Sequence, residues 1–243
     1  MHAERAVAAV PRKRLTIHRV AAGDGAGLDA DGAGWKGIAA EAIARPGAAE
    51  HAQLRLAHDE HTLYACFEVD DASPWRNRGQ DPQRLFKSGD AVDLQLALAS
   101  GPAASAIGTQ HVRLLCAPCD GHALCVLMRP IDRLAPPEAA AVYRSPVGER
   151  RFDRVTVLAE AVVTVRVEAA RYRVALAVPL TALGLQASAG ALLHGDAGFI
   201  SSNADGTANV ARTYWSNPAT NLVNDLPSEA WLYPATWGEM VWE

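Results

Sequence analysis

Alternation of apolar and polar residues with a period of two is the sequence feature that most constrains the fold. In TLYACFEVD (62–70), every second residue from Leu63 to Val69 is apolar and the residues between them point the other way. This period is typical of a β-strand with one face in a core. The same alternation recurs in the stretches 92–98 and 163–178.

Turn signals divide these stretches into hairpins. Asp59–His61 separates strands expected at 53–58 and 62–69, and Ala169–Ala170 separates two strands within 163–178. Helix signals are scarce, and 179–184 predicts at most a short turn of helix. The weaker alternations predict further strands at 111–116, 123–129, 195–202, 210–215, 230–233 and 239–242. We therefore expect an all-β chain, a two-sheet antiparallel β-sandwich of jelly-roll or immunoglobulin-like type with little helix.

The length suits one sizeable core. The chain has 243 residues, 49% of them hydrophobic, and no linker rich enough to divide two domains. We predict a loose N-terminal arm over 1–14 and a single sandwich domain over 15–243. Residues 99–108 and 132–153 are expected to be loops or insertions.

Charge and hydropathy exclude two classes of partner. The formal net charge is −4 and no basic stripe is present, so nucleic acid is not an expected partner. No run of about 18 apolar residues occurs, so no membrane-spanning segment is expected. The first fifteen residues lack the order of a signal peptide, which leaves the compartment unknown.

Two tryptophans lie in polar stretches where a core strand is not expected. Trp75 follows the strand that ends near Val69, and Trp215 lies in ARTYWSNPATN (211–221). Flat indole rings cover the C–H faces of a pyranose, and amides, carboxylates and guanidinium groups satisfy its hydroxyl rim. The pair predicts a sugar slot between two indoles, and the alternative is that each ring caps the core.

Polar residues near these tryptophans are the candidates for the rim of that slot. Arg113 is notable because it interrupts an apolar strand face, which indicates a cleft. A solvated surface role is the alternative for each residue. The predicted ligand-binding set is Trp75, Trp215, Arg113, Arg76, Asn77, Asp81, Lys87, Asp90 and Asn217.

The segment CAPCDGHALC (116–125) offers zinc ligands. Thiolates and imidazole are the ligands that Zn²⁺ prefers, and the candidates are Cys116, Cys119, His122 and Cys125. The alternative is a β-hairpin with Asp120–Gly121 as a type I′ turn.

Carboxylates at strand ends offer a structural calcium site. Hard oxygen ligands suit Ca²⁺, and Asp70, Asp71 and Asp93 flank strand ends without the spacing of an EF-hand. Catalytic signatures are missing: the sequence contains no GxSxG, no HExxH and no P-loop. We therefore expect no enzymatic activity.

Several stretches, taken in order, resemble the family 9 carbohydrate-binding modules, which belong with the DOMON-like sandwiches. The stretches are LDADGAGWKGI, LRLAHDEHTLYACFEVDDASPW, LFKSGDAVDLQLAL, YRVALAVPLTALGL and TYWSN, and they extend from about Leu28 to Trp237. The resemblance implies a non-catalytic β-sandwich in which two tryptophans clamp a mono-, oligo- or polysaccharide and calcium supports the fold. Trp75 and Trp215 match the clamp by position, and Arg113 looks like the family's sugar-binding arginine.

The resemblance also implies a biological setting. Such modules accompany secreted or periplasmic glycoside hydrolases in polysaccharide breakdown. Two alternatives stay open. One is the haem-binding branch of the DOMON-like group, with Met128 and a histidine such as His111 as axial ligands. The other is a structural domain without a ligand.

Overall fold

The computed structural model describes residues 12–99, 101, 103–146, 148–217 and 232–243. Extended chain dominates it, as the alternation predicts. The strands are β1 (Arg14–Arg19), β2 (Glu41–Ala44), β3 (His51–His58), β4 (Thr62–Asp70), β5 (Ala91–Ala97), β6 (His111–Cys119), β7 (His122–Arg129), β8 (Ala141–Ser145), β9 (Gly148–Phe152), β10 (Arg154–Val157), β11 (Val162–Glu168), β12 (Arg171–Pro179), β13 (Leu192–Ser202), β14 (Asn209–Tyr214) and β15 (Gly238–Trp242). The α-helices are α1 (Leu85–Ser88) and α2 (Leu180–Leu183), and the 3₁₀ turns are η1 (Asp24–Gly27), η2 (Ala33–Trp35), η3 (Pro82–Arg84), η4 (Pro137–Ala139) and η6 (Pro234–Thr236).

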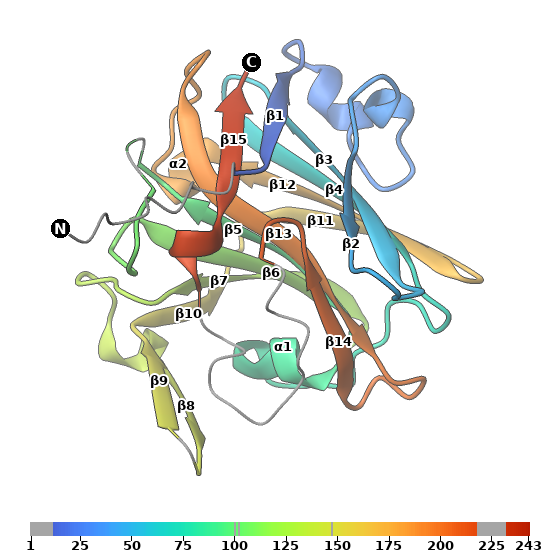
Figure 1. Ribbon diagram of the computed structural model, residues 1–243, viewed down its shortest axis with the longest axis vertical. Coiled ribbons are helices and arrows are strands. Elements are labelled where there is room, and N and C mark those ends of the chain that lie inside the picture. The colour runs from blue at the N-terminus through green and yellow to red at the C-terminus, as the bar shows by residue number, and fades with distance from the viewer. Residues whose placement is uncertain (1–11, 100, 102, 147, 218–231) are drawn as a thin grey trace, which may run out of the picture.

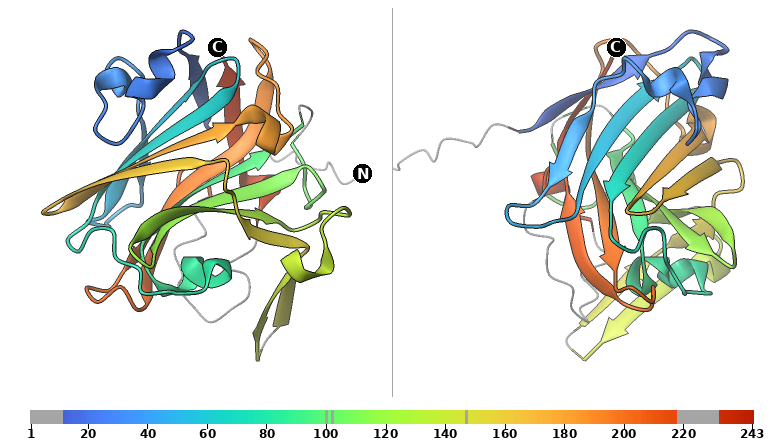
Figure 2. Two further views of the ribbon diagram at one scale, coloured as in Figure 1. Left: turned by 180° about the vertical axis from the view of Figure 1, so that it is seen from behind. Right: turned by 90° about the vertical axis from the view of Figure 1, so that its right-hand side faces the viewer.

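Most strands belong to one strongly curled sheet. Its order is β10-β7-β6-β5-β13-β15-β1-β3-β4-β12-β11, with β14 added beside β13 and β2 beside β3. The curl brings β11 at one end into contact with β7 near the other. Two layers therefore face each other as in a sandwich, and Figure 2 shows them edge-on. Pairing is antiparallel except where β1 lies parallel to β15 and to β3.

The main core fills the space inside the curl. The apolar residues that alternate along β4, from Leu63 to Val69, all belong to it, and so do Val92 to Leu96 on alternate positions of β5. The other face of β4 is also buried, because η1, η2 and their connections cover Tyr64 and Cys66. The predicted all-β sandwich is therefore confirmed, as are both hairpins.

The insertion 132–153 contains structure where loops were expected. The hairpin β8–β9 forms a second, two-stranded sheet that projects from the lower end of the molecule (Figure 1). Tyr143 packs edge-on against Phe86 of α1 and against Phe152, with ring centroids 5.1 and 5.8 Å apart. Apolar burial of these rings orders a segment whose polar sequence shows little alternation.

The expected N-terminal arm is not loose at its described end. Residues 1–11 lie outside the described part of the chain. Arg14 is already part of β1, where it pairs with Glu239 of β15. Lys13 donates a hydrogen bond from Nζ to the Trp215 carbonyl at 2.6 Å. The expected strand at 230–233 is also wrong where it is described, since Leu232 and Tyr233 are not in a strand. The prediction of a single domain stays a prediction.

Among the described residues, no helix has the length and apolar character needed to span a lipid bilayer.

Candidate functional site

Trp75 is anchored in the loop between β4 and β5. Its side chain is half-buried and its ring packs on Tyr172, with centroids 5.2 Å apart. Its backbone has a φ of 57°, an uncommon value for a residue other than glycine. The next amide holds this conformation, because the Arg76 N–H donates to Asp90 Oδ2 at 2.6 Å.

Three predicted rim residues hold this loop together. The buried Asp90 carboxylate accepts from the Arg76 and Ser202 amides, and Asn77 Nδ2 donates to the Leu85 carbonyl at 2.8 Å. Burial raises the pKa of Asp90 to about 6, although these amide bonds act in the opposite direction. These contacts assign Asp90 and Asn77 to loop architecture.

The other two rim candidates of this loop are Asp81 and Lys87. Asp81 is exposed and caps η3, accepting from the Gln83 amide at 2.9 Å. Lys87 is half-buried on α1, and the Arg76 guanidinium reaches the Ala204 carbonyl. The loop is therefore tied to the turn between β13 and β14.

Trp215 is a core residue. Its side chain is 2% exposed and belongs to the main core. The ring lies against Gly238 of β15, where an added Cβ would be 2.3 Å from Trp215 Cζ3. Only the absence of a side chain at Gly238 leaves room for the indole.

The structure does not bring the two indoles together. The Trp75 loop meets the turn before β14, where the Arg78 amide donates to the Gly206 carbonyl at 2.7 Å, whereas Trp215 follows the end of β14. A strand of six residues spans roughly 20 Å. The expected slot for one pyranose between the two rings is therefore not formed.

Arg113 lies in a buried polar cluster on the face of β5, β6 and β14 that points away from the main core. Its Nη2 donates to Asp93 Oδ2 at 2.7 Å, and the Tyr214 hydroxyl donates to the same oxygen at 2.6 Å. Arg113 and Asp93 side chains are 0% exposed. The charged face that indicated a cleft in the sequence is covered, with the guanidinium 5.6 Å from the centre of the Phe86 ring.

A groove opens beside this cluster, between the end of β14 and the turn that joins β2 to β3. Its volume is about 740 Å³, within the range of small-ligand sites. Aromatic and aliphatic side chains mix there with hydroxyl, amide and cationic groups. The lining residues are Lys13, Ala44, Arg45, Pro46, Arg212, Thr213, Tyr214, Trp215, Ser216 and Asn217.

Asp196 fixes one wall of the groove. Its carboxylate accepts from the Ser216 amide at 2.8 Å and from the Asn217 amide at 3.1 Å. Burial raises the pKa of Asp196 to about 7. Both amides therefore point inward, and Asn217 is the predicted ligand-binding residue that the structure places in the groove together with Trp215.

The proposed calcium ligands are separated by other bonds. Asp70 pairs with Arg171 at 2.6 Å, and Asp93 is engaged by Arg113. Asp71 is buried and accepts from the Ser73 amide at 2.7 Å. Among the described residues, no three His, Cys, Asp or Glu side chains lie close enough to share a metal ion. The three carboxylates therefore do not converge on one point, and a structural calcium ion stays a prediction.

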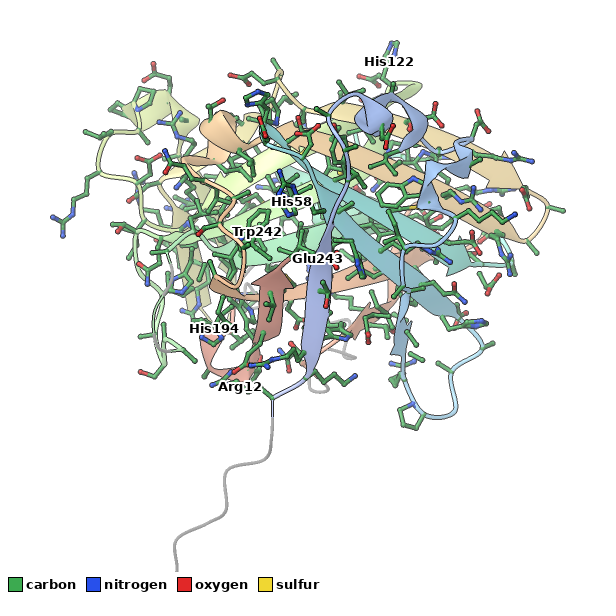
Figure 3. The ribbon with its side chains drawn as sticks, turned by 90° about the horizontal axis from the view of Figure 1, so that it is seen from above. Arg12, His58, His122, His194, Trp242 and Glu243 are labelled. Atoms are coloured by element: carbon green, nitrogen blue, oxygen red, sulfur yellow. The ribbon has the colours of Figure 1, made fainter. Side chains whose placement is uncertain are left out.

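The cysteine segment forms the hairpin alternative. Asp120 and Gly121 both have positive φ, 49° and 79°, as a type I′ turn requires. Cys116 and Cys125 face the main core, whereas Cys119 belongs to the cluster on the opposite face of the sheet. His122 is exposed and points outward at the edge of the molecule (Figure 3). The four residues therefore do not assemble a zinc site.

The two candidate haem ligands are enclosed by protein. Met128 and His111 are both 0% exposed. The His111 ring packs edge-on against Trp237, with centroids 5.2 Å apart, and its Nδ1 accepts from the Gly108 amide. Neither side chain is presented to an open site.

Three cations of the groove, Lys13, Arg45 and Arg212, were missed at the sequence level. Arg212 alternates with Tyr214 on one face of β14, which is the same signal that singled out Arg113. Lys13 and Arg45 carry no such signal, because only the fold brings their segments to the end of β14.

The fold is similar to that of a family 9 carbohydrate-binding module from Caldicellulosiruptor kristjanssonii. The structure of that module in complex with cellotriose matches with a TM-score of 0.62 at 14% identity, over 95% of this chain and 94% of that chain. Its complex with glucose matches with a TM-score of 0.59 at 13% identity, over 95% and 96%. A protein structure from Bacteroides uniformis matches with a TM-score of 0.55 at 14% identity, over 96% and 100%.

No family model matches the sequence. No curated protein matches it either. The structural likeness covers nearly the whole chain and confirms the predicted fold, the β-sandwich of the family 9 modules.

Proposed function

We propose that this chain binds carbohydrate without catalysis, in the groove between β14 and the turn joining β2 to β3. The observation that carries the proposal is the lining of this groove. Tyr214 and Pro46 contribute ring and aliphatic atoms, and Ser216 and Asn217 lie beside them. This combination suits a ligand with C–H faces and a hydroxyl rim. The structural neighbours in complex with cellotriose and glucose support the same class of ligand.

The proposal moves the saccharide away from the slot between two indoles. Trp75 lies at the far end of β14, so it is not part of this site. Trp215 contributes to the wall of the groove while its ring stays in the core. Arg113 supports the groove indirectly. Arg113 and the Tyr214 hydroxyl both donate to Asp93 Oδ2, and this shared acceptor holds Tyr214 in place.

The test is isothermal titration of the purified chain with glucose, cellotriose and xylo-oligosaccharides. We expect measurable affinity for at least one of these, with loss of affinity in Asn217→Ala. Asp81→Ala is the matched control, since Asp81 is an exposed polar residue on the Trp75 loop. If Asp81→Ala weakens binding and Asn217→Ala does not, the site lies on that loop. A glycan array without any bound saccharide would contradict carbohydrate binding altogether.

The wider role in polysaccharide breakdown belongs to the same proposal and has the resemblance as its support. We expect no release of reducing ends from polysaccharide by the chain alone. Fusion to a glycoside hydrolase should raise the rate of sugar release from insoluble polysaccharide without changing the rate on soluble substrate. Equal rates on the insoluble substrate with and without the fused chain would remove the proposed role.

A further inference from the structure

The groove between β14 and the β2–β3 turn is lined by positive charge. Lys13, Arg45 and Arg212 contribute to it from three separate segments. Among its described lining residues there is no aspartate or glutamate. Cationic groups in a concave site concentrate positive potential and favour anionic ligands.

Arg212 is the most informative of the three cations. It is 5% exposed, and its Nε has no hydrogen-bond partner. Nη2 donates to the Tyr214 hydroxyl at 3.3 Å, and the guanidinium lies 5.9 Å from the centre of the same ring. Within the described part of the chain, Arg212 forms no ion pair. A buried charge without an ionic partner is costly, so this guanidinium favours an anion brought by a ligand.

Two buried carboxylates close to Tyr214 and to the groove wall are bonded to other groups. Asp93 Oδ2 accepts from Arg113 and from the Tyr214 hydroxyl. Asp196 accepts from the amides of Ser216 and Asn217. Neither carboxylate forms an ion pair with Arg212, so the guanidinium can pair with an anion that enters the groove.

We propose that the groove takes an acidic saccharide whose oxyanion pairs with Arg212, in particular the carboxylate of a uronic acid residue. The planar guanidinium matches a carboxylate in a bidentate geometry. Lys13 at the rim adds a second positive charge, while Tyr214 and Pro46 offer surface to the sugar ring. This inference rests on the proposed carbohydrate-binding function and names its substrate class.

The test compares an oligogalacturonate with its methyl ester, in which each carboxylate has lost its charge and gained a methyl group. Isothermal titration at low and at high salt should show at least about tenfold tighter binding of the acid, with the preference shrinking as salt rises. A sulfated oligosaccharide is included as a second source of oxyanion. Its binding as tightly as the uronate would overturn the preference for a carboxylate.

Matched lysine variants test the site itself. Lys13→Met should reduce the affinity for the oligogalacturonate several-fold, and Lys36→Met should leave it unchanged, because Lys36 is exposed and lies outside the groove. Arg212→Gln should abolish the difference between acid and ester. The circular dichroism spectrum and melting temperature of Arg212→Gln report whether this variant still folds. If it does not fold, the loss of affinity in Lys13→Met decides whether the ligand binds in this groove.

The outcomes separate this inference from the proposed function. Equal or tighter binding of the neutral ester overturns the acidic preference and leaves carbohydrate binding standing. Binding of acetate as tight as that of the oligogalacturonate shows an anion site without sugar recognition and overturns both. Absence of binding by every saccharide removes the proposed function and this inference with it.

A second, independent inference concerns Cys116 and Cys125. They are direct partners in the β6–β7 ladder, and both are buried in the main core. The type I′ turn at Asp120–Gly121 makes Cys119 and His122 a hydrogen-bonded pair, and pairs alternate along an antiparallel ladder. Three steps further, Cys116 and Cys125 form a non-hydrogen-bonded pair, in which Cα atoms lie about 4.5 Å apart.

This spacing lies within the range that a disulfide spans. The two thiols are already in hydrogen-bond contact, which with burial raises the pKa of Cys116 well above its usual value. We infer that these cysteines form a cross-strand disulfide when the chain folds in the presence of a disulfide oxidant. Both thiols lose their protons and one electron each, and one molecule of oxidised glutathione is reduced to two of glutathione. Burial of the pair means that the exchange precedes closure of the core.

The test refolds the chain with oxidised and reduced glutathione and, in parallel, with dithiothreitol. Oxidative refolding should remove two hydrogens from the intact mass and join the peptides of Cys116 and Cys125. The melting temperature should rise by roughly 5–10 °C. Cys119→Ser should behave in the same way, whereas Cys116→Ser should not form the link. Full alkylation of both thiols after oxidative refolding, or a link through Cys66 or Cys119, would overturn the inference.

Discussion

The ring of Trp215 occupies the space that a side chain at Gly238 would need. A Cβ on Gly238 would lie 2.3 Å from Trp215 Cζ3 and 2.5 Å from Cη2. The indole is therefore part of the contact between the end of β14 and β15, and 2% of it is exposed. This contact with Gly238 makes Trp215 a core residue, although its sequence context is that of a polar loop.

Trp215→Ala should lower the free energy of unfolding by ~3–5 kcal/mol, because it removes a large buried ring and leaves a cavity. Gly238→Ala should cost ~1–3 kcal/mol through overpacking against the same ring. Urea unfolding followed by circular dichroism measures both. A loss below about 1 kcal/mol for Trp215→Ala would mean that the ring is not part of the core.

Trp75→Ala should cost ~2 kcal/mol, since the ring is half-buried against Tyr172. Affinity for any bound saccharide should stay within about twofold of the wild-type value, because Trp75 lies at the other end of β14 from the groove. Titration of the variant checks this. A large loss of affinity in a folded Trp75→Ala protein would restore the loop to the binding site.

Asp93→Asn should lower the free energy of unfolding by ~3–5 kcal/mol. The carboxylate that accepts from Arg113 and Tyr214 is fully buried. Its removal leaves the buried Arg113 guanidinium without a counter-charge, and water does not reach this position to solvate it. Arg144→Ala, which breaks the exposed pair with Glu149, is the control and should cost less than about 1 kcal/mol. Similar losses in the two variants would mean that the buried cluster adds no special stability.

Stability should fall as pH rises from about 4 to about 7. Burial raises the pKa of Asp90 to about 6 and that of Asp196 to about 7. In this window the folded protein therefore holds protons that the unfolded chain releases, and the free energy of unfolding decreases with pH by roughly 4–6 kcal/mol. Asp59, with a lowered pKa, contributes in the opposite sense at more acidic pH.

Asp196→Asn is the control for this pH dependence. The difference between its stability curve and that of the wild type isolates the Asp196 carboxyl from His111, whose lowered pKa opposes the trend. The variant should gain stability relative to the wild type as pH rises toward 7. Parallel curves for the two proteins would show that Asp196 does not titrate in this range.

The strands could be predicted wherever one face alone is apolar or the turn between them is short. The hairpins of β3–β4 and β11–β12 follow from alternation. The β3–β4 turn also follows from Asp59, which accepts from the His61 and Thr62 amides at 2.8 Å. The hairpin β8–β9 could not be predicted, because its order depends on Tyr143 packing against Phe86 some sixty residues earlier in the chain.

The candidate site was predicted only in its residue types. The sequence indicates tryptophans, amides and an arginine on strand faces, but burial decides which of them a ligand can reach. Arg113 and Arg212 carry the same signal on their strands, yet Arg113 lies over Phe86 with no exposed area while Arg212 lines the groove. Arg113 is covered because a segment distant in sequence, which carries Phe86, packs on its face of the sheet, whereas Arg212 borders the open groove.

Local patterning therefore determined the strands, their hairpins and the face of β4 and β5 that enters the core, because side-chain alternation depends only on neighbouring residues. Tertiary structure decided that Trp215 is a core ring, that Trp75 stands a strand length away from it, and that Lys13, Arg45 and Arg212 meet in one groove. Those relationships depend on how β1, β2 and β14 are brought together by the curl of the sheet, and long-range packing of this kind is not encoded in any short stretch of sequence.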